Sequence, residues 1–238
     1  MTTQELLSSI RSYCLVNSSE ANVLKYSRYF KGGVFNAYGL ANGMVETKVN
    51  ELLQDQSIDI DLILEAAPEL VRSEKYEETG FVLLMINKRV KHYTREVFKA
   101  IESWFAIGIH NWAHADMLGM WILPDLVKQK AVGIEDFRPW LTSEYKFQRR
   151  CVPVTLIKSL KTEVDFTVLF SFIEPLMTDP EREVHQGCGW FLREAWKKNR
   201  EVTEAFLLKH KNTAPRLIIQ YATEKMTKEE KVRYKREK

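Results

Sequence analysis

The stretch TGFVLLMI, residues 79–86, places Phe81, Leu84 and Met85 at intervals of three and four, which is the period of an amphipathic α-helix. Alternating strand patterns bounded by Asn-Gly or Asp-Gly turns are nearly absent from the chain. We therefore expect an all-α protein. Three further stretches are apolar in the same manner: HADMLGMWIL at 114–123, RRCVPVTLI at 149–157 and GCGWFLRE at 187–194.

These four stretches recur at a nearly constant interval. Their equivalent positions are Gly80, Asp116, Val152 and Gly189, which are 36, 36 and 37 residues apart. A helix pair of about this length cannot bury its apolar face alone, whereas stacked copies can. The fold that we predict is a right-handed α-α superhelix of HEAT-like helix pairs, whose inner helices line a concave surface. An irregular helical bundle is the alternative.

The length is enough for one large domain or two small ones, and the composition is that of a globular protein. Of the 238 residues, 45% are hydrophobic, and no apolar run approaches the roughly 20 residues that a membrane span needs. The N-terminal residues MTTQELLSSIRSYC show no secretion signal, so we expect a cytoplasmic protein. We assign residues 1–222 to a single HEAT-like α-solenoid domain. Residues 223–238 are polar and basic, and we expect a helix end or a tail there.

Basic residues are unevenly distributed along the chain. The net charge of +3 is too small to indicate a nucleic-acid partner. Residues 1–145 contain 15 Lys+Arg and 19 Asp+Glu, a net charge of −4, whereas residues 146–238 contain 20 and 13, a net charge of +7. The C-terminal part is therefore the candidate anion-binding side.

Neither a metal site nor a disulfide framework is indicated. His110 and His114 are four residues apart, as in half of a helical metalloprotease motif, but Asn111 stands where that motif needs a glutamate. We expect no metal ion and no cofactor. The cysteines are odd in number and far apart, so we expect reduced core thiols at Cys14, Cys151 and Cys188.

Trp112 and Asp116 form the first candidate site. On a helix these two residues project from one face, because they are four positions apart. An indole face attracts a cation through its quadrupole, and a neighbouring carboxylate adds Coulombic attraction that grows when water is excluded. The pair therefore suits a cationic guest. The alternative is that Trp112 is a core residue and Asp116 a helix cap or an ion-pair partner.

The second candidate site is basic. Arg149 and Arg150 are followed, about one repeat later, by Trp190 and Arg193, which are three residues apart on one helical face. Guanidinium groups at Arg150 and Arg193 could fork onto phosphate oxygens. The alternative is that these arginines are solvated ends of a packed helix face.

Four blocks in chain order carry a resemblance to a known family. They are SRYFKGG followed by YGL, then NWAHAD, then QRRC, and then GCGWFLREAWKK. Over most of residues 20–225 the chain resembles the AlkD-like DNA alkylation repair family. That resemblance implies a HEAT-like superhelix with duplex DNA in its concave face. It also implies removal of purines made cationic by alkylation, such as 3-methyladenine and 7-methylguanine.

The resemblance also implies roles for individual residues. Trp112 and Asp116 match the aromatic and acidic residues placed against the damaged nucleotide, and Trp190 matches the second aromatic wall. The residues implied to contact DNA are Tyr29, Arg149, Arg150 and Arg193, with Arg149 and Arg150 competing for one family position. The partner expected is double-stranded DNA with alkylated bases. A lesion-binding cleft needs one copy of the chain, so we expect a monomer.

Two positions depart from the family pattern. Ala113 stands where well-known members carry an acid, and Phe147 stands where the family often shows tryptophan. These departures leave two functions open. One is a monofunctional DNA glycosylase of base excision repair. The other is a catalytically silent HEAT-like paralogue that binds DNA structures or a protein partner.

Overall fold

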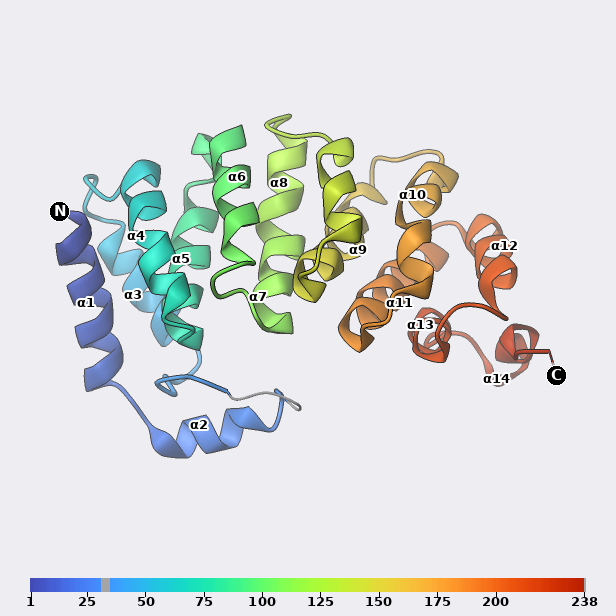
Figure 1. Cartoon of the computed structure of the whole chain (residues 1–238), viewed down its shortest axis with the longest axis horizontal. Coiled ribbons are helices and arrows are strands. Elements are labelled where there is room, and N and C mark those ends of the chain that lie inside the picture. The colour runs from blue at the N-terminus through green and yellow to red at the C-terminus, as the bar shows by residue number, and fades with distance from the viewer. Residues whose placement is uncertain (31–34, 238) are drawn as a thin grey trace. The chain divides into compact units, whose positions relative to one another are not determined.

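A computed structural model describes residues 1–30 and 35–237, and within these residues the chain is helical and contains no β-strand (Figure 1). The predicted all-α class is confirmed. The α-helices are α1 (Thr3–Val16), α2 (Glu20–Ser27), α3 (Met44–Leu52), α4 (Ile60–Arg72), α5 (Tyr76–Lys88), α6 (Arg95–Trp104), α7 (Trp112–Met117), α8 (Leu123–Lys128), α9 (Lys146–Ser159), α10 (Phe166–Ile173), α11 (Arg182–Trp196), α12 (Arg200–His210), α13 (Arg216–Ala222) and α14 (Lys228–Lys231). No helix among the described residues has the length and apolar character that a membrane span requires.

The chain divides into two compact units, Met1–His114 and Ala115–Lys238. Residues 1–222, which the sequence assigns to one domain, are thus shared between them. The division falls within α7, so Trp112 belongs to the first unit and Asp116 to the second. The four aligned positions of the sequence repeat lie on alternate α-helices, namely Gly80 on α5, Asp116 on α7, Val152 on α9 and Gly189 on α11.

Glycines set how closely the helices of the second unit approach each other. In this unit α11 packs against both α9 and α13. A Cβ at Gly189 would lie 2.4 Å from Cβ of Tyr221 on α13, far inside van der Waals contact. A Cβ at Gly119 would lie 2.8 Å from the Val154 side chain on α9. The absence of a side chain at these positions therefore permits the close packing.

A π-helical turn, Leu118–Ile122, joins α7 to α8, so residues 112–128 form one continuous helical segment. Pro124 lies in the first turn of α8 and has no N–H group to donate to a preceding carbonyl. A wider turn before a proline relieves this mismatch in the hydrogen-bond ladder. Asp116 thus stands just ahead of an irregular turn.

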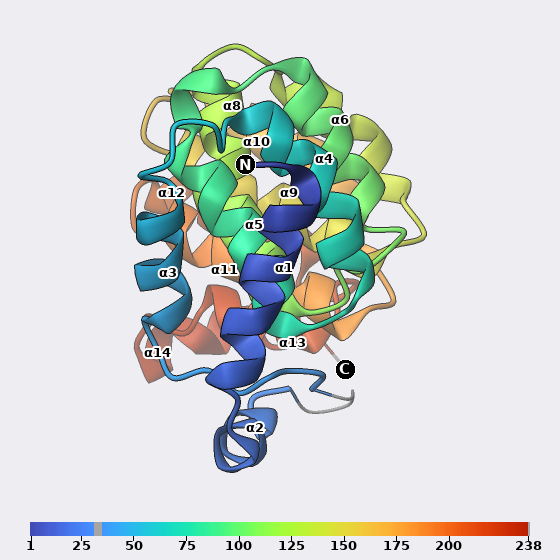
Figure 2. The ribbon, with the colours of Figure 1, turned by 90° about the vertical axis from the view of Figure 1, so that its left-hand side faces the viewer.

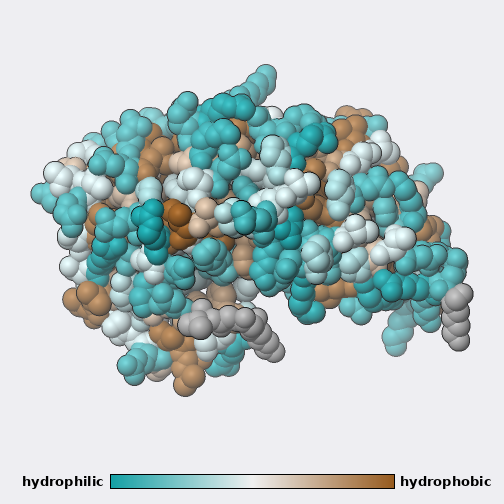
Figure 3. Space-filling model, viewed as in Figure 1, coloured by the Kyte–Doolittle hydropathy of each residue, from teal (hydrophilic) through white to brown (hydrophobic). Residues whose placement is uncertain are grey.

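Helix α2 lies apart from the other helices of the first unit (Figures 1 and 2). It has no buried residue, and apolar side chains reach the surface where it lies (Figure 3). Leu24 of α2 is 78% exposed. The contacts that hold α2 therefore come from its ends and from the segment Asn36–Leu40.

The segment after residue 222 is folded up to residue 237. Thr227 caps α14, and the turn Val232–Tyr234 follows. Tyr234 is buried, and its carbonyl accepts a hydrogen bond from Nη1 of Arg216 at 2.9 Å. The side chain of Arg236 donates to the carbonyl of Ala214. The expected helix end or tail is thus tied to α13 and to the residues before it.

The three cysteines are free and buried, as the sequence predicted: Cys14, Cys151 and Cys188. Burial, together with the charges of Glu77 and Glu78, raises the pKa of the Cys14 thiol to about 12. Burial likewise raises the pKa of the other two thiols. The negative charge of Asp116 raises the pKa of Cys151 as well, and that of Asp179 raises the pKa of Cys188.

Candidate functional site

Asp116 is held by a two-pronged ion pair. Nε and Nη2 of Arg150 donate to Oδ1 and Oδ2 of Asp116 at 2.8 and 2.9 Å, which is the planar fork geometry of arginine with a carboxylate. The Asp116 side chain is 17% exposed and that of Arg150 is 7% exposed. The carboxylate is therefore fixed in orientation and partly shielded from water, while one side remains accessible.

Arg150 also connects this carboxylate to α11. Its Nη1 donates to the carbonyl of Glu183 at 2.6 Å, and its side chain lies against Gly187, one turn further along α11. Three of the five guanidinium N–H groups are thus engaged by Asp116 and Glu183. A side chain at Gly187 would compete with Arg150 for space, because its Cβ would lie 3.3 Å from Cγ of Arg150.

Trp190 lies on the face of α11 that Arg150 contacts. Glu183, Gly187 and Trp190 are separated by four and three residues, so they share one helical face. Trp190 is half-buried. In the second unit, Arg150 on α9 therefore contacts both the carboxylate on α7 and the face of α11 that carries the indole of Trp190.

Trp112 is an exposed residue and not a core residue. The residue is 39% exposed, and one face of its indole stacks on Phe30 with ring centroids 5.5 Å apart and an interplanar angle of 20°. The indole Nε1 donates to the carbonyl of Tyr29 at 3.3 Å. A half-exposed indole fixed at one face and one edge is suited to receive a ligand on its other face.

His114 is a structural residue at the start of α7. The Asn111 side chain accepts a hydrogen bond from the His114 N–H at 3.0 Å and donates to its Nδ1 at 2.8 Å. Its Nε2 lies 3.0 Å from the carbonyl of Tyr76, and because a carbonyl only accepts, Nε2 carries the proton. Burial lowers the pKa of His114 to about 4, so the ring stays neutral at physiological pH.

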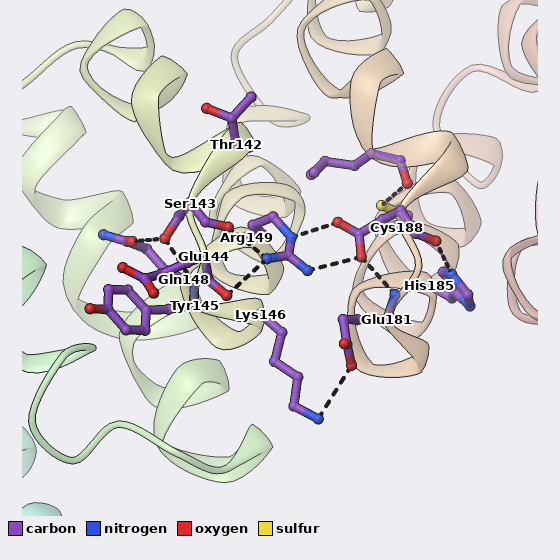
Figure 4. Close-up of polar contacts among 12 residues, drawn as sticks. Thr142, Ser143, Glu144, Tyr145, Lys146, Gln148, Arg149, Glu181, His185 and Cys188 are labelled. Carbon is purple, nitrogen blue, oxygen red and sulfur yellow. Dashed lines mark hydrogen bonds and ion pairs between the residues drawn. The ribbon is translucent and has the colours of Figure 1, made fainter.

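Arg149 is occupied by a different carboxylate (Figure 4). Its Nε and Nη2 donate to the two carboxylate oxygens of Asp179 at 2.6 and 3.2 Å. Its Nη1 donates to the carbonyls of Ser143 and Glu144 at 2.6 and 3.3 Å. Both side chains of the ion pair are buried, at 11% and 5% exposure. These contacts join the loop before α9 to the loop before α11, which is a structural task.

Asp179 is itself fully engaged at this junction. Its Oδ1 also accepts the backbone N–H of Glu181 at 2.8 Å, and its carbonyl is within hydrogen-bonding distance of the His185 ring (Figure 4). Contact of Arg149 with DNA remains a prediction, and it would require this buried pair to open.

The remaining two predicted contact residues are nearer the surface. Tyr29 is 63% exposed and follows α2. The Arg193 side chain is 19% exposed and pairs with Glu194 and with Glu224. Contact of either residue with DNA remains a prediction. Part of the SRYFKGG block, Lys31 to Gly33, lies outside the described residues.

No group of three or more His, Cys, Asp or Glu side chains that could hold a metal ion occurs in the described parts of the chain. His110 lies 3.6 Å from Glu74, whereas both ring nitrogens of His114 have partners inside the protein. The two histidines therefore have different partners.

Comparison with protein families bears on this arrangement. The sequence profile of the DNA alkylation repair enzyme family matches residues 15–226, which is most of the chain. The chain belongs to the DNA alkylation repair enzyme family. The family's role is DNA alkylation repair, and DNA is accordingly the partner that membership implies. Comparison with curated protein sequences gave no match.

A solved structure has the fold of this family member. It is described as a predicted DNA alkylation repair enzyme from Enterococcus faecalis, and it superposes with a TM-score of 0.74. The superposition covers 89% of this chain and 98% of that chain, with 16% sequence identity. At this identity the similarity establishes the fold alone.

The two residues that depart from the family pattern, Ala113 and Phe147, lie outside the contacts described above. Ala113 follows Trp112 on α7 and is half-buried. Phe147 on α9 is buried at 9% exposure, and the ammonium of Lys146 lies 5.4 Å from its ring centroid. Neither residue takes part in the Asp116–Arg150 ion pair.

Two participants in these contacts were not predicted from the sequence. Phe30 stacks on Trp112 but lies in the turn after α2, where no periodic signal links it to residue 112. The Glu183 carbonyl that receives Arg150 is a backbone group, which no residue pattern reveals. A useful signal for Phe30 was its position directly after Tyr29 in the SRYFKGG block.

Proposed function

We propose that this protein is a monofunctional DNA glycosylase that hydrolyses the N-glycosidic bond of cationic alkylated purines in duplex DNA. The observation that supports this most is the Asp116 carboxylate, oriented by Arg150 and one helical turn from the exposed indole of Trp112. We further propose that one copy of the chain acts alone, without a metal ion.

The proposed chemistry needs an anion more than it needs an acid. A purine alkylated at N3 or N7 already carries positive charge, so it can leave without protonation while the sugar develops oxocarbenium character. A fixed carboxylate stabilises that developing cation and can position the attacking water. Asp116 has this role in the proposal, because Arg150 fixes the orientation of the carboxylate while the Asp116 side chain stays 17% exposed.

The two indoles are proposed to bind the nucleotide. Trp112 presents an aromatic face that is only partly covered, and a cation over such a face gains about 0.5 to 2 kcal/mol. Trp190 is proposed as the second aromatic wall, on the helix face that Arg150 contacts.

Arg150 has two possible tasks, and they predict different salt dependences. If it contacts a phosphate, Arg150→Ala lowers the slope of log affinity against log salt by about one contact. If it only orients Asp116, the slope stays unchanged while base release falls. The ion pair with Asp116 and the bond to the Glu183 carbonyl support the orienting task.

Asp116→Asn tests the proposal directly. We expect release of 7-methylguanine from methylated duplex DNA to fall by at least about tenfold, with DNA affinity nearly intact, because the charge that stabilises the sugar cation is lost. Single-turnover release measured by chromatography of the free base gives the rate, and a binding titration gives the affinity.

Asp179→Asn is the matched control. It also removes a carboxylate from an arginine fork in the second unit, so it reproduces the loss of stability while leaving Asp116 and its partner Arg150 unchanged. Both variants are compared well below their unfolding temperatures. Equal release by wild type and Asp116→Asn would remove Asp116 from the mechanism. DNA binding by the wild type without any base release would instead identify a binding protein.

A further inference from the structure

One face of Trp112 is covered by its own protein. Phe30 lies parallel to the indole at 5.5 Å between ring centroids, and the neighbouring Tyr29 carbonyl accepts the indole N–H. Two consecutive residues thus fix both the plane and the edge of the ring. Trp112 is still 39% exposed, and because Phe30 stacks on one face of the indole, we infer that a ligand would approach the opposite face.

Phe30 is held from behind by further rings. It stacks on Phe35 with centroids 4.5 Å apart and packs edge-on against Tyr76 at 5.5 Å. Tyr76 in turn stacks on His114 at 4.8 Å, and His114 belongs to the same helix as Trp112. We call these four rings the aromatic support: Phe30, Phe35, Tyr76 and His114. The support begins at the ring that stacks on Trp112 and ends at His114, two residues after Trp112 on α7. Stacked and edge-on ring pairs of this kind stabilise a structure beyond the apolar area that they bury.

The position of Phe30 depends on how α2 is attached. The backbone N–H of Ser19 donates to the Tyr38 carbonyl at 2.8 Å, and the Asn22 side chain donates to the Gly39 carbonyl at 3.0 Å. Because a Cβ at Gly39 would lie 2.2 Å from the Ser19 carbonyl oxygen, only glycine allows this approach. Gly39 also has φ of +82°, a conformation that favours glycine.

The far side of the same segment is anchored by a buried carboxylate. Glu77 is 4% exposed and accepts the backbone N–H groups of Tyr38, Gly39 and Leu40 at 2.8, 2.7 and 3.1 Å. Charge-assisted hydrogen bonds of this kind are about twice as strong as neutral ones. The segment thus fixes the start of α2, and the aromatic support fixes its end.

We propose that Phe30 is a positioning residue that makes Trp112 a one-sided platform for a planar cationic base. An exposed tryptophan without such backing would exchange between rotamers and would pay that entropy on binding a ligand. With Phe30 in place the indole is presented in one orientation. The inference deepens the proposed function and rests on it for the identity of the ligand.

Fluorine NMR of the 5-fluorotryptophan-labelled protein tests the positioning itself. The Trp112 resonance is assigned by its loss in Trp112→Phe. In Phe30→Ala we expect that resonance to shift and broaden, because ring-current contact and restraint are lost. Phe30→Tyr keeps a ring at the position and restores the wild-type resonance. Leu24→Ala, an exposed change on α2, the helix that precedes Phe30, leaves it unaltered.

The second readout is base release under single-turnover conditions. We expect Phe30→Ala to lower 7-methylguanine release about five- to tenfold, mainly through weaker binding of the lesion, and Phe30→Tyr to restore it within about twofold. An unchanged Trp112 resonance in Phe30→Ala would overturn the positioning role. A shifted Trp112 resonance with unchanged base release would show that the positioning of Trp112 by Phe30 does not matter for binding the ligand. If the wild type releases no base, the proposed glycosylase fails, while the resonance still decides the positioning.

Discussion

Arg149 and Arg150 are neighbours in the chain but reach different elements. Successive residues on a helix point about 100° apart, so their side chains do not face the same partner. Arg149 joins the loops before α9 and α11 through Asp179, whereas Arg150 holds Asp116 and the Glu183 carbonyl. The two arginines of a basic dipeptide that suggests a phosphate site thus belong to separate ion pairs, a buried one with Asp179 and a partly buried one with Asp116. Their positive charge is largely compensated by these carboxylates.

His114 makes the free energy of unfolding depend on pH. Its pKa is about 4 in the folded protein and about 6.5 in an unfolded chain, so above about pH 6.5 it is neutral in both states. As the pH falls from 6.5 to 4, His114 binds a proton in the unfolded chain but stays largely neutral in the folded protein. The folded state therefore loses about 2–3 kcal/mol between pH 7.5 and 4.5 from this group.

Urea unfolding of the wild type and of His114→Gln at four pH values measures this contribution. The variant is less stable at neutral pH, because the contact with Tyr76 is lost, but its free energy of unfolding should fall less steeply below pH 6.5. Parallel pH profiles for the two proteins would show that the pKa of His114 is not lowered by burial.

At the scale of elements, the closest helix contacts occur where a glycine faces a neighbouring helix. Gly189 faces α13, and Gly119 faces α9. A Cβ at Gly80, by contrast, would meet nothing within 4 Å, although Gly80 occupies the equivalent place in the sequence repeat. Equivalent positions in the repeat therefore carry glycine for different reasons.

Gly189→Ala and Gly80→Ala form a matched pair of variants that should change the free energy of unfolding in opposite directions. The first places a Cβ 2.4 Å from Tyr221 and 2.9 Å from the Ile218 carbonyl, so α11 and α13 must separate, at a cost of about 1–3 kcal/mol. The second enters open space in a helix and should stabilise by about 0.5–1 kcal/mol. Thermal unfolding compares both with the wild type, and a neutral Gly189→Ala would disprove the close contact.

Helical periodicity and the 36-residue interval predicted most of the architecture. Both are local properties of the chain, and apolar residues at three and four spacing leave few alternatives to a helix. The π-turn at Leu118–Ile122 was not predicted, because it results from Pro124 acting on the ladder of a helix already formed. The spacing of Trp112 and Asp116 made them candidate site residues, which remains a prediction. The two-pronged ion pair of Arg150 with Asp116 depends on tertiary packing that no spacing encodes.

At the scale of the whole molecule, the two units differ in charge. The first, residues 1–114, has 12 Lys+Arg and 14 Asp+Glu, a net charge of −2, whereas the second has 23 and 18, a net charge of +5. A duplex is a dense row of negative charges, so its attraction is expected mainly toward the second unit.

Arg193→Gln tests that expectation against Arg138→Gln. Both arginines belong to the second unit and both pair with carboxylates, but only Arg193 lies on α11 with Trp190. We expect Arg193→Gln to lower the salt slope of duplex binding by about one contact and Arg138→Gln to leave it unchanged. Fluorescence anisotropy titrations from about 50 to 200 mM salt provide the slopes, and equal slopes would place Arg193 away from the duplex.

The buried thiols have a consequence for the conditions in which a member of this family works. Alkylating electrophiles react with thiolates before most other protein groups, and a thiolate forms only where the thiol is accessible and its pKa is not too high. Here all three sulfurs are buried, and burial raises the pKa of each. The folded chain thus offers alkylating reagents no ready thiolate, so its cysteines are protected during the same chemical exposure that alkylates DNA.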